Sequence, residues 1–118
     1  MEYLLLIASD ETATPARGTP EFDAFMGGWM QFNQLLVDGD HFIAGAGLQP
    51  TATATTVRKS GSGQEIVDGP FAETKEQLGG FYLINASDLD QALSLARALP
   101  IPAGSVEVRP LSFRPDAR

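Results

Sequence analysis

The sequence predicts one small α+β domain, and three observations lead to this class. The length of 118 residues fits a single domain. Hydrophobic content is 43% and charged content 19%, which is ordinary for a globular protein. Segments whose apolar residues have the spacing of a strand alternate along the chain with segments that have the spacing of a helix. We therefore expect one domain over residues 1–113, followed by a loose tail over residues 114–118.

The first part of the chain predicts a strand, a helix and a second strand. Residues 3–8 form an apolar run of strand length. Thr19 can cap a helix with Pro20 at its first position, and residues 38–40 end that helix. Residues 42–48 then resemble a short strand. The expected apolar face of the helix consists of Phe22, Phe25, Met26, Trp29, Phe32 and Leu36.

A β-hairpin is expected next. Residues 51–58 are β-prone through their threonines, residues 60–63 are a turn signal, and residues 64–67 supply the partner strand. The following Asp68-Gly69-Pro70-Phe71 ends the hairpin because proline cannot donate to a ladder. A row formed by Thr51, Thr53 and Thr55 would reflect either β-propensity or a hydroxyl-lined pocket.

A third core strand, a second helix and a last strand complete the pattern. Residues 80–84 are strongly strand-like, and residues 106–111 form the final strand. Between them, Ser87 and Asp90 have capping-box spacing, and Pro100 follows the helix end. Without the hairpin the order is β-α-β-β-α-β, which is the ferredoxin-like arrangement.

The central strands are apolar on both faces. Successive side chains of residues 3–8 point to opposite faces, and the same holds for residues 80–84. Two helices can cover only one face of such a sheet, so a second copy of the chain is the simplest cover for the other. Glu107 and Arg109 would share this second face, and we interpret them first as a structural or interfacial salt bridge.

Composition excludes several classes of function. The chain has no cysteine, which excludes disulfides, thiolate metal sites and thiol nucleophiles. A net charge of −7 opposes binding to nucleic acid. The apolar start is too short for a membrane span and lacks the basic region of a signal peptide, so we expect a cytoplasmic protein without a membrane contact. No phosphate loop, dinucleotide fingerprint or zinc-ligand spacing is present, so we expect no cofactor and no metal.

Residues 67–81, which read VDGPFAETKEQLGGF, resemble the DGPF branch of the YCII-related family. Three further segments fit the same branch: residues 47–58, 88–90 and 105–110. The resemblance implies a ferredoxin-like fold that dimerises as an α/β barrel. It also implies a functional link to an extracytoplasmic-function sigma factor, although the branch has no settled biochemical role.

More distant YCII members resemble enzymes that use a His-Asp pair, including one that eliminates chloride from a lactone. Their histidine lies on the first helix, and their aspartate lies just before the last strand. The expected first helix of this chain contains no histidine, and Leu99-Pro100 stands roughly at the position of the aspartate. The dyad mechanism is therefore not carried over to this chain.

The candidate catalytic residues are Asp68, Glu73 and Lys75. The Asp68 carboxylate either accepts hydrogen bonds from the amides of its own turn or serves as a general base or ligand anchor. Glu73 and Lys75 belong either to a solvated surface loop or to a pair that orients a substrate or moves a proton.

The candidate ligand-binding residues are His41, Thr55 and Gln77. His41 is the only histidine and follows two aspartates, a weak metal signal without further ligands. An exposed or strand-edge histidine is the alternative interpretation, and as a base it would titrate near neutral pH. Thr55 belongs to the threonine row, and Gln77 closes the polar segment after the turn.

Two functions compete on this evidence. The first is a small-molecule-binding or regulatory module, supported by the acidic surface, the missing dyad and the family's association with transcription regulators. The second is a cofactor-free lyase or isomerase that acts on a small polar metabolite by carboxylate and lysine proton transfer. Whether the protein is an enzyme stays open at this point, because function depends on the site and not on the fold.

Overall fold

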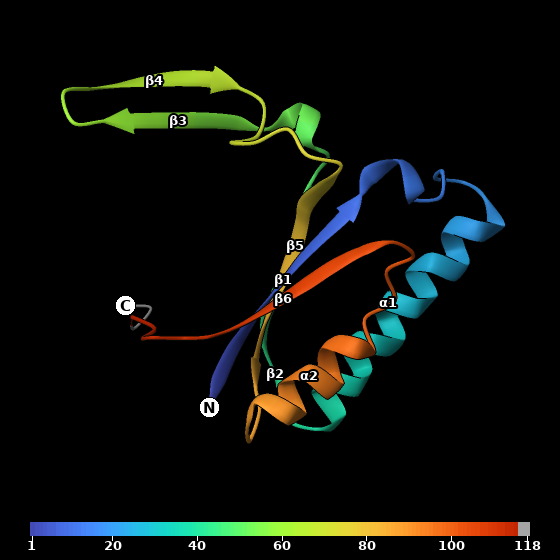
Figure 1. Cartoon of the computed structure of the whole chain (residues 1–118). Coiled ribbons are helices and arrows are strands. Elements are labelled where there is room, and N and C mark those ends of the chain that lie inside the picture. Colours follow the sequence, from blue (N-terminus) through green and yellow to red (C-terminus); the bar gives the residue numbers. More distant parts are fainter. Residues whose placement is uncertain (116–118) are drawn as a thin grey trace.

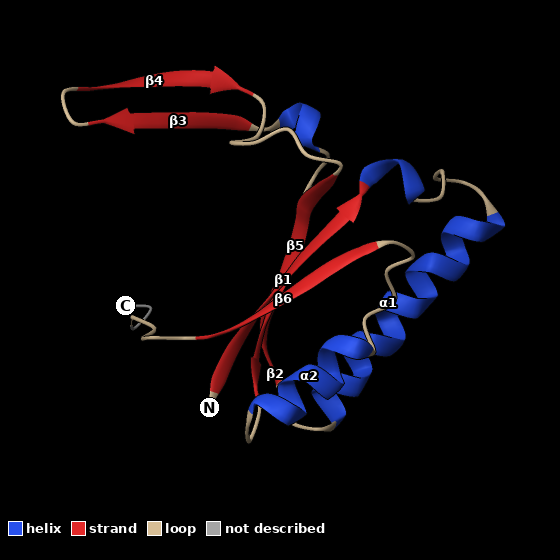
Figure 2. Cartoon of the chain, viewed as in Figure 1, coloured by secondary structure: helices blue, strands red, loops and turns tan. Residues whose placement is uncertain are grey.

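A computed structural model of the chain describes residues 1–115. It confirms the α+β class and the ferredoxin-like order with an inserted hairpin (Figure 2). The elements in chain order are β1 (Glu2–Asp10), the short 3-10 helix η1 (Glu11–Ala13), α1 (Pro20–Asp38), β2 (Phe42–Gly47), the 3-10 helix η2 (Thr51–Thr53), β3 (Thr55–Ser60), β4 (Gly63–Asp68), β5 (Glu76–Asn85), α2 (Leu89–Arg97) and β6 (Gly104–Pro110).

Four strands form one antiparallel sheet in the order β2-β5-β1-β6. Both helices lie on the same side of this sheet (Figure 1). β1 and β5 therefore occupy the centre, where each has a neighbouring strand on both sides. This position explains why their sequences are the most continuously apolar of all the strands.

The hydrophobic core lies between the sheet and the two helices. Leu5 of β1, Leu36 of α1 and Ile84 of β5 are fully buried at its centre. Alternate β1 residues face the helices, so Tyr3 and Ile7 join Leu5 in this core. Each large apolar side chain that is fully buried here contributes about 1.5–3 kcal/mol to stability.

The two helices begin with side-chain caps. Thr19 caps α1 as predicted, and its hydroxyl accepts the backbone N–H three residues later at 3.1 Å. The predicted capping box of Ser87 and Asp90 is wrong by one residue. Asp88 is the cap and accepts the Gln91 N–H at 2.9 Å, while the Gln91 side-chain oxygen accepts the Ser87 N–H at 2.7 Å. Two adjacent polar residues qualify as caps, and Asp88 is the one whose side chain accepts a hydrogen bond from the helix.

β3 and β4 form a two-stranded antiparallel ribbon, which we call the arm (residues 55–68). The arm projects from the sheet on the side opposite the helices (Figure 1). The predicted hairpin is thus confirmed, but its first strand begins later than expected. Thr51 and Thr53 lie in η2, where the Thr53 hydroxyl donates to the Pro50 carbonyl at 2.7 Å. The predicted row of Thr51, Thr53 and Thr55 on one strand is therefore wrong.

The second face of the sheet, which we call the open face, is not covered by any helix among residues 1–115 (Figure 1). Strand register places its half-buried apolar side chains opposite one another, namely Leu4 with Leu83 and Leu6 with Phe81. On the edge strand β6, Glu107 and Arg109 share this face and form an ion pair at 3.4 Å. Both side chains are exposed, so the pair contributes little to stability.

Both ends of the described chain are attached to the sheet. The Arg114 side chain donates two hydrogen bonds to the Glu2 carboxylate, at 3.0 and 2.9 Å. The predicted loose tail covers residues 114–118, of which residues 116–118 lie outside the described part. No helix within residues 1–115 has the length and apolar character needed to cross a membrane.

Candidate functional site

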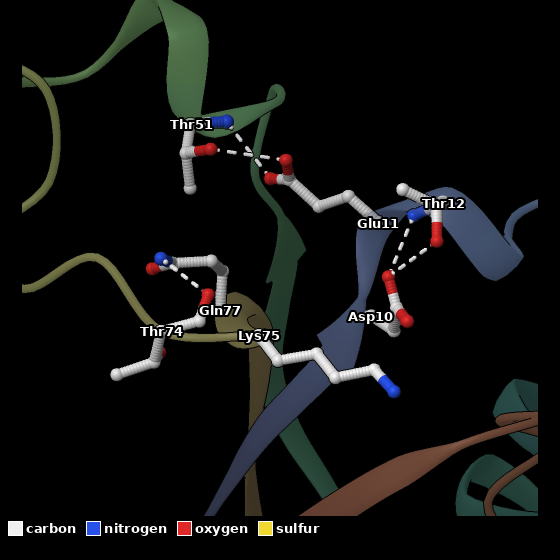
Figure 3. Close-up of a pocket in the computed structure, with 7 residues that line it drawn as sticks. All are labelled: Asp10, Glu11, Thr12, Thr51, Thr74, Lys75 and Gln77. Carbon is white, nitrogen blue, oxygen red and sulfur yellow. Dashed lines mark hydrogen bonds between the residues drawn. The ribbon is translucent and has the colours of Figure 1, made fainter.

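A pocket of about 410 Å³ opens where β1 ends and β5 begins (Figure 3). Four segments meet there: the end of β1, η1, η2 and the turn that leads into β5. Its lining residues are Asp10, Glu11, Thr12, Thr51, Thr74, Lys75 and Gln77. The pocket therefore combines carboxylates, hydroxyls, an amide and an ammonium group in one polar site.

Glu11 connects η1 to η2 across this pocket. Its Oε1 accepts the Thr51 backbone N–H at 2.8 Å, and its Oε2 accepts the Thr51 hydroxyl at 2.9 Å. The two residues are forty positions apart in sequence, so this bidentate contact joins distant segments. Both carboxylate oxygens of Glu11 are therefore engaged in hydrogen bonds that join two walls of the pocket.

Asp10 is occupied in a similar way by its own turn. Its Oδ1 accepts the Thr12 backbone N–H at 3.0 Å and the Thr12 hydroxyl at 2.6 Å. The side-chain and then the backbone hydrogen bond of Thr12 hold the pKa of Asp10 below its ordinary value. Partial burial opposes this effect, and the positive charge of Lys75 adds to it. Asp10 is consequently a weaker base than an ordinary aspartate.

Lys75 and Gln77 enter the pocket from the opposite wall. Gln77 Nε2 donates to the Thr74 carbonyl at 3.0 Å and to the Ala72 carbonyl at 3.1 Å, which closes the turn before β5. The Lys75 side chain extends past Asp10 (Figure 3), and its ammonium group forms no ion pair within residues 1–115. Lys75 is thus the charged group of this site that is available to a ligand.

Asp68 lies outside the pocket, at the base of the arm and opposite Thr55. Its exposed carboxylate accepts no hydrogen bond from the described residues, so the hydrogen bonds expected to its own turn are not found. Gly69 closes the turn instead, with its N–H donating to the Ala54 carbonyl at 2.8 Å and its carbonyl accepting the Thr56 hydroxyl at 2.6 Å. Gly69 has φ +100, which glycine adopts readily.

The other predicted site residues are dispersed. Glu73 is exposed in the loop before the pocket and does not line it. His41 lies at the opposite end of the sheet, before β2, with Nδ1 2.8 Å from the Asn85 carbonyl oxygen. Of the six predicted site residues, the structure brings only Lys75 and Gln77 into this pocket. Within residues 1–115 no three His, Asp or Glu side chains gather as a metal site would require.

The remaining wall of the pocket was missed by sequence reasoning. Asp10, Glu11 and Thr12 follow the first strand, and Thr51 begins a segment that the sequence assigned to a strand. The local spacing of Asp10 and Thr12 is typical of a turn and carries no sign of a site. These residues become one site only when β1 and β5 pair, which no local pattern reveals.

Comparison with known proteins agrees with the resemblance of residues 67–81. Residues 1–113 match the family model described as the YCII-related domain. A curated protein from Rhizobium meliloti (strain 1021), described as uncharacterized protein R00369, is 42% identical to this chain over 116 residues. The alignment covers 96% of this chain and 94% of that protein. Assignment to the DGPF branch within the family stays a prediction.

Proposed function

The chain belongs to the YCII-related family, and we propose that it is a small-molecule-binding module. The ligand is a small polar molecule with an anionic group, and it occupies the pocket beside Lys75. The observation that carries this proposal is the Lys75 ammonium group, which stands beside two carboxylates that other residues already engage.

The Lys75 ammonium group is the part of the lining that supports an anionic ligand. An ammonium group offers three hydrogen-bond donors and no acceptor, so it suits a carboxylate or a similar group. The hydroxyls of Thr12 and Thr51 are committed to Asp10 and Glu11, and these contacts fix the wall against which the ligand would lie. A volume of about 410 Å³ falls within the range of small-molecule sites.

Two features favour binding over proton transfer. Asp10 is the pocket carboxylate whose pKa is affected by the charge of Lys75, and its lowered pKa makes it a poor general base near neutral pH. Asp68 and Glu73, which a lyase or isomerase mechanism would use, do not line the pocket. A reaction driven by those carboxylates would therefore lack a shared cavity with Lys75.

The position of the pocket also supports a regulatory role. Thr51 precedes the arm in sequence and Thr74 follows it, so both connections of the arm pass along the pocket. A ligand that bridges these connections would favour one orientation of the arm over others. Ligand binding would in this way change the surface that the protein offers to a partner.

We further propose that the protein acts as a homodimer in which two open faces meet as an α/β barrel. The support is the row of half-buried apolar side chains on β1 and β5, with no helix of the described chain above them. Apolar sheet faces of this kind are normally covered in solution.

The ligand proposal is tested by thermal unfolding with a panel of small mono-, di- and tricarboxylates and inorganic phosphate. We expect at least one of these anions to raise the Tm of the wild type and to leave the Tm of Lys75→Met unchanged. Lys59 is the other lysine of the chain and lies on the arm, so Lys59→Met is the matched control and should keep the response.

Two outcomes would contradict the ligand proposal. One is an absence of any shift across the panel, and the other is an equal loss of response in both lysine variants. Turnover of a bound member of the panel, measured by NMR over hours, would instead favour the lyase or isomerase alternative.

A further inference from the structure

We propose that the arm is a clasp that packs against a second copy of the chain, with Val57 and Ile66 as its contact residues. This inference rests on the proposed homodimer and adds a second, separate contact to it. The first contact is made by the open face, and the second is made by the arm.

Strand pairing shows which side of the arm is available. Val57 and Ile66 stand directly opposite each other and therefore share one side of the ribbon. Arg58 and Glu65 share the other side, and Arg58 donates to the Phe71 carbonyl of the chain's own loop at 3.2 Å. The side with the apolar pair consequently faces away from that loop, and Val57 is 53% and Ile66 74% exposed.

A ribbon of this kind is not stable without support. An isolated two-stranded hairpin is marginal in water, and both of its outer edges offer unpaired backbone groups. Here β3 and β4 pair only with each other, and the hydrogen bonds to the rest of the chain lie near the base. An apolar pair in the middle of such a ribbon suits a contact with another molecule.

The chain exposes more surface than a compact monomer of the same mass. The chain exposes 8329 Å², whereas a compact monomer of its mass exposes about 6,200 Å². Its radius of gyration is 16.1 Å, compared with about 13.5 Å for a compact domain of its length. The excess surface of about 2,100 Å² exceeds the roughly 800 Å² that each partner buries in a standard interface.

The position of the arm identifies the partner as a second copy. The arm and the open face lie on the same side of the molecule (Figure 1), so one neighbour that covers the open face also comes within reach of the arm. The charges allow this choice: Arg58 and Lys59 against Glu65 and Asp68 leave the arm with no net charge, while the whole chain carries −7. A neutral arm is not repelled by an acidic copy of the same chain.

The test is sedimentation equilibrium of the full chain and of three variants. Ile66→Glu places a charge in the proposed arm contact. Met30→Glu is the matched control, because Met30 is 71% exposed but lies on α1, on the other side of the sheet. Leu83→Glu tests the open face independently. Ile66 and Met30 are both exposed, so neither substitution threatens the fold, and circular dichroism checks this.

We expect a wild-type dimer whose dissociation constant rises at least tenfold in Ile66→Glu and stays unchanged in Met30→Glu. The arm proposal alone is overturned if Ile66→Glu dimerises like the wild type while Leu83→Glu becomes monomeric. Both the arm and the homodimer are overturned if the wild type stays monomeric up to 100 µM, or if Met30→Glu is the variant that dissociates. Should Leu83→Glu fail to fold, Leu83→Ala replaces it in the same comparison.

Discussion

The carboxylates of this protein differ in the number of hydrogen bonds that they accept, and these hydrogen bonds affect how protonation changes stability. Glu2 accepts two hydrogen bonds from Arg114, Asp10 accepts two from Thr12, and Asp68 accepts none among residues 1–115. The first two are stabilised in their charged form, so their protonation is coupled to folding.

For Glu2 we predict a pH-dependent contribution to stability. The hydrogen bond from Arg114 is the main cause that lowers the pKa of Glu2 from its ordinary value of 4.5, and the charge of Arg114 adds to it. A lowered folded-state pKa means that the stabilisation is fully present above the unfolded-state pKa and is lost as pH falls through the folded value. The Tm of Glu2→Gln should therefore lie below that of the wild type at pH 7.

The same difference in Tm should shrink as the pH drops below 4.5 and vanish once Glu2 is protonated in the folded chain. Thermal melts of both proteins between pH 7 and pH 3 measure it. Glu73→Gln is the control for the removal of a carboxylate from an exposed loop. A difference that stays constant down to pH 3 would mean that the charge of Glu2 is not responsible.

For Asp68 we predict that Asp68→Asn changes the free energy of unfolding by less than about 0.5 kcal/mol, as for surface positions generally. The reason is that Gly69 and Thr56, and not the Asp68 carboxylate, hold the turn. Urea unfolding measures this change. A loss of about 1–2 kcal/mol, the size of a hydrogen bond to a charged group, would show that the carboxylate supports its turn after all.

At the scale of elements, the start of α2 distinguishes the observed cap, Asp88, from the predicted capping box of Ser87 and Asp90. Asp88 accepts the Gln91 N–H, so Asp88→Ala should lower the free energy of unfolding by about 1 kcal/mol, as at other helix caps. Asp90→Ala is the control and should lose only a few tenths of a kcal/mol, through the helix dipole. Urea titration of both variants distinguishes them, and a larger loss in Asp90→Ala would restore the capping box first predicted from the sequence.

The strands of the arm and its direction have different causes. Its strands follow from alternation and the turn at residues 61–62, which local sequence reveals. Its direction follows from contacts at the base, where Gly69 pairs with Ala54 and Glu11 holds Thr51. The segment Asp68-Gly69-Pro70-Phe71 is therefore best described as the joint between arm and sheet.

At the scale of the whole molecule, the two faces of β1 should respond differently to the same substitution. Leu5 is fully buried against the helices, so Leu5→Ala should cost about 2–5 kcal/mol of stability at every protein concentration. Leu4 lies on the open face, so the cost of Leu4→Ala should increase with protein concentration as the proposed dimer forms. Urea unfolding at 1 and 100 µM measures both, and an equal concentration dependence for the two variants would contradict this assignment.

Several features of the fold follow from residues that are neighbours in sequence. The strands, the hairpin and the cap of α1 are set by local spacing, and Thr19 at the start of α1 was correctly placed for this reason. The segment 51–54 was assigned wrongly because threonine favours strands in general. Hydrogen bonds to Pro50 and to Glu11 override that preference here.

The sequence by itself determined the α+β class, the order of core elements, the inserted hairpin and the family, since each depends on local spacing or on residues read in order. Only the tertiary structure decided which polar residues share a pocket. Lys75 meets Asp10 because β5 pairs antiparallel with β1, and that register places Asp10 opposite Glu76, the residue after Lys75. Asp68 is close to Lys75 in sequence, yet the chain turns at Gly69 and leaves it at the base of the arm. Proximity along the chain could not reveal this, because the site is assembled by pairing between strands separated by more than sixty residues.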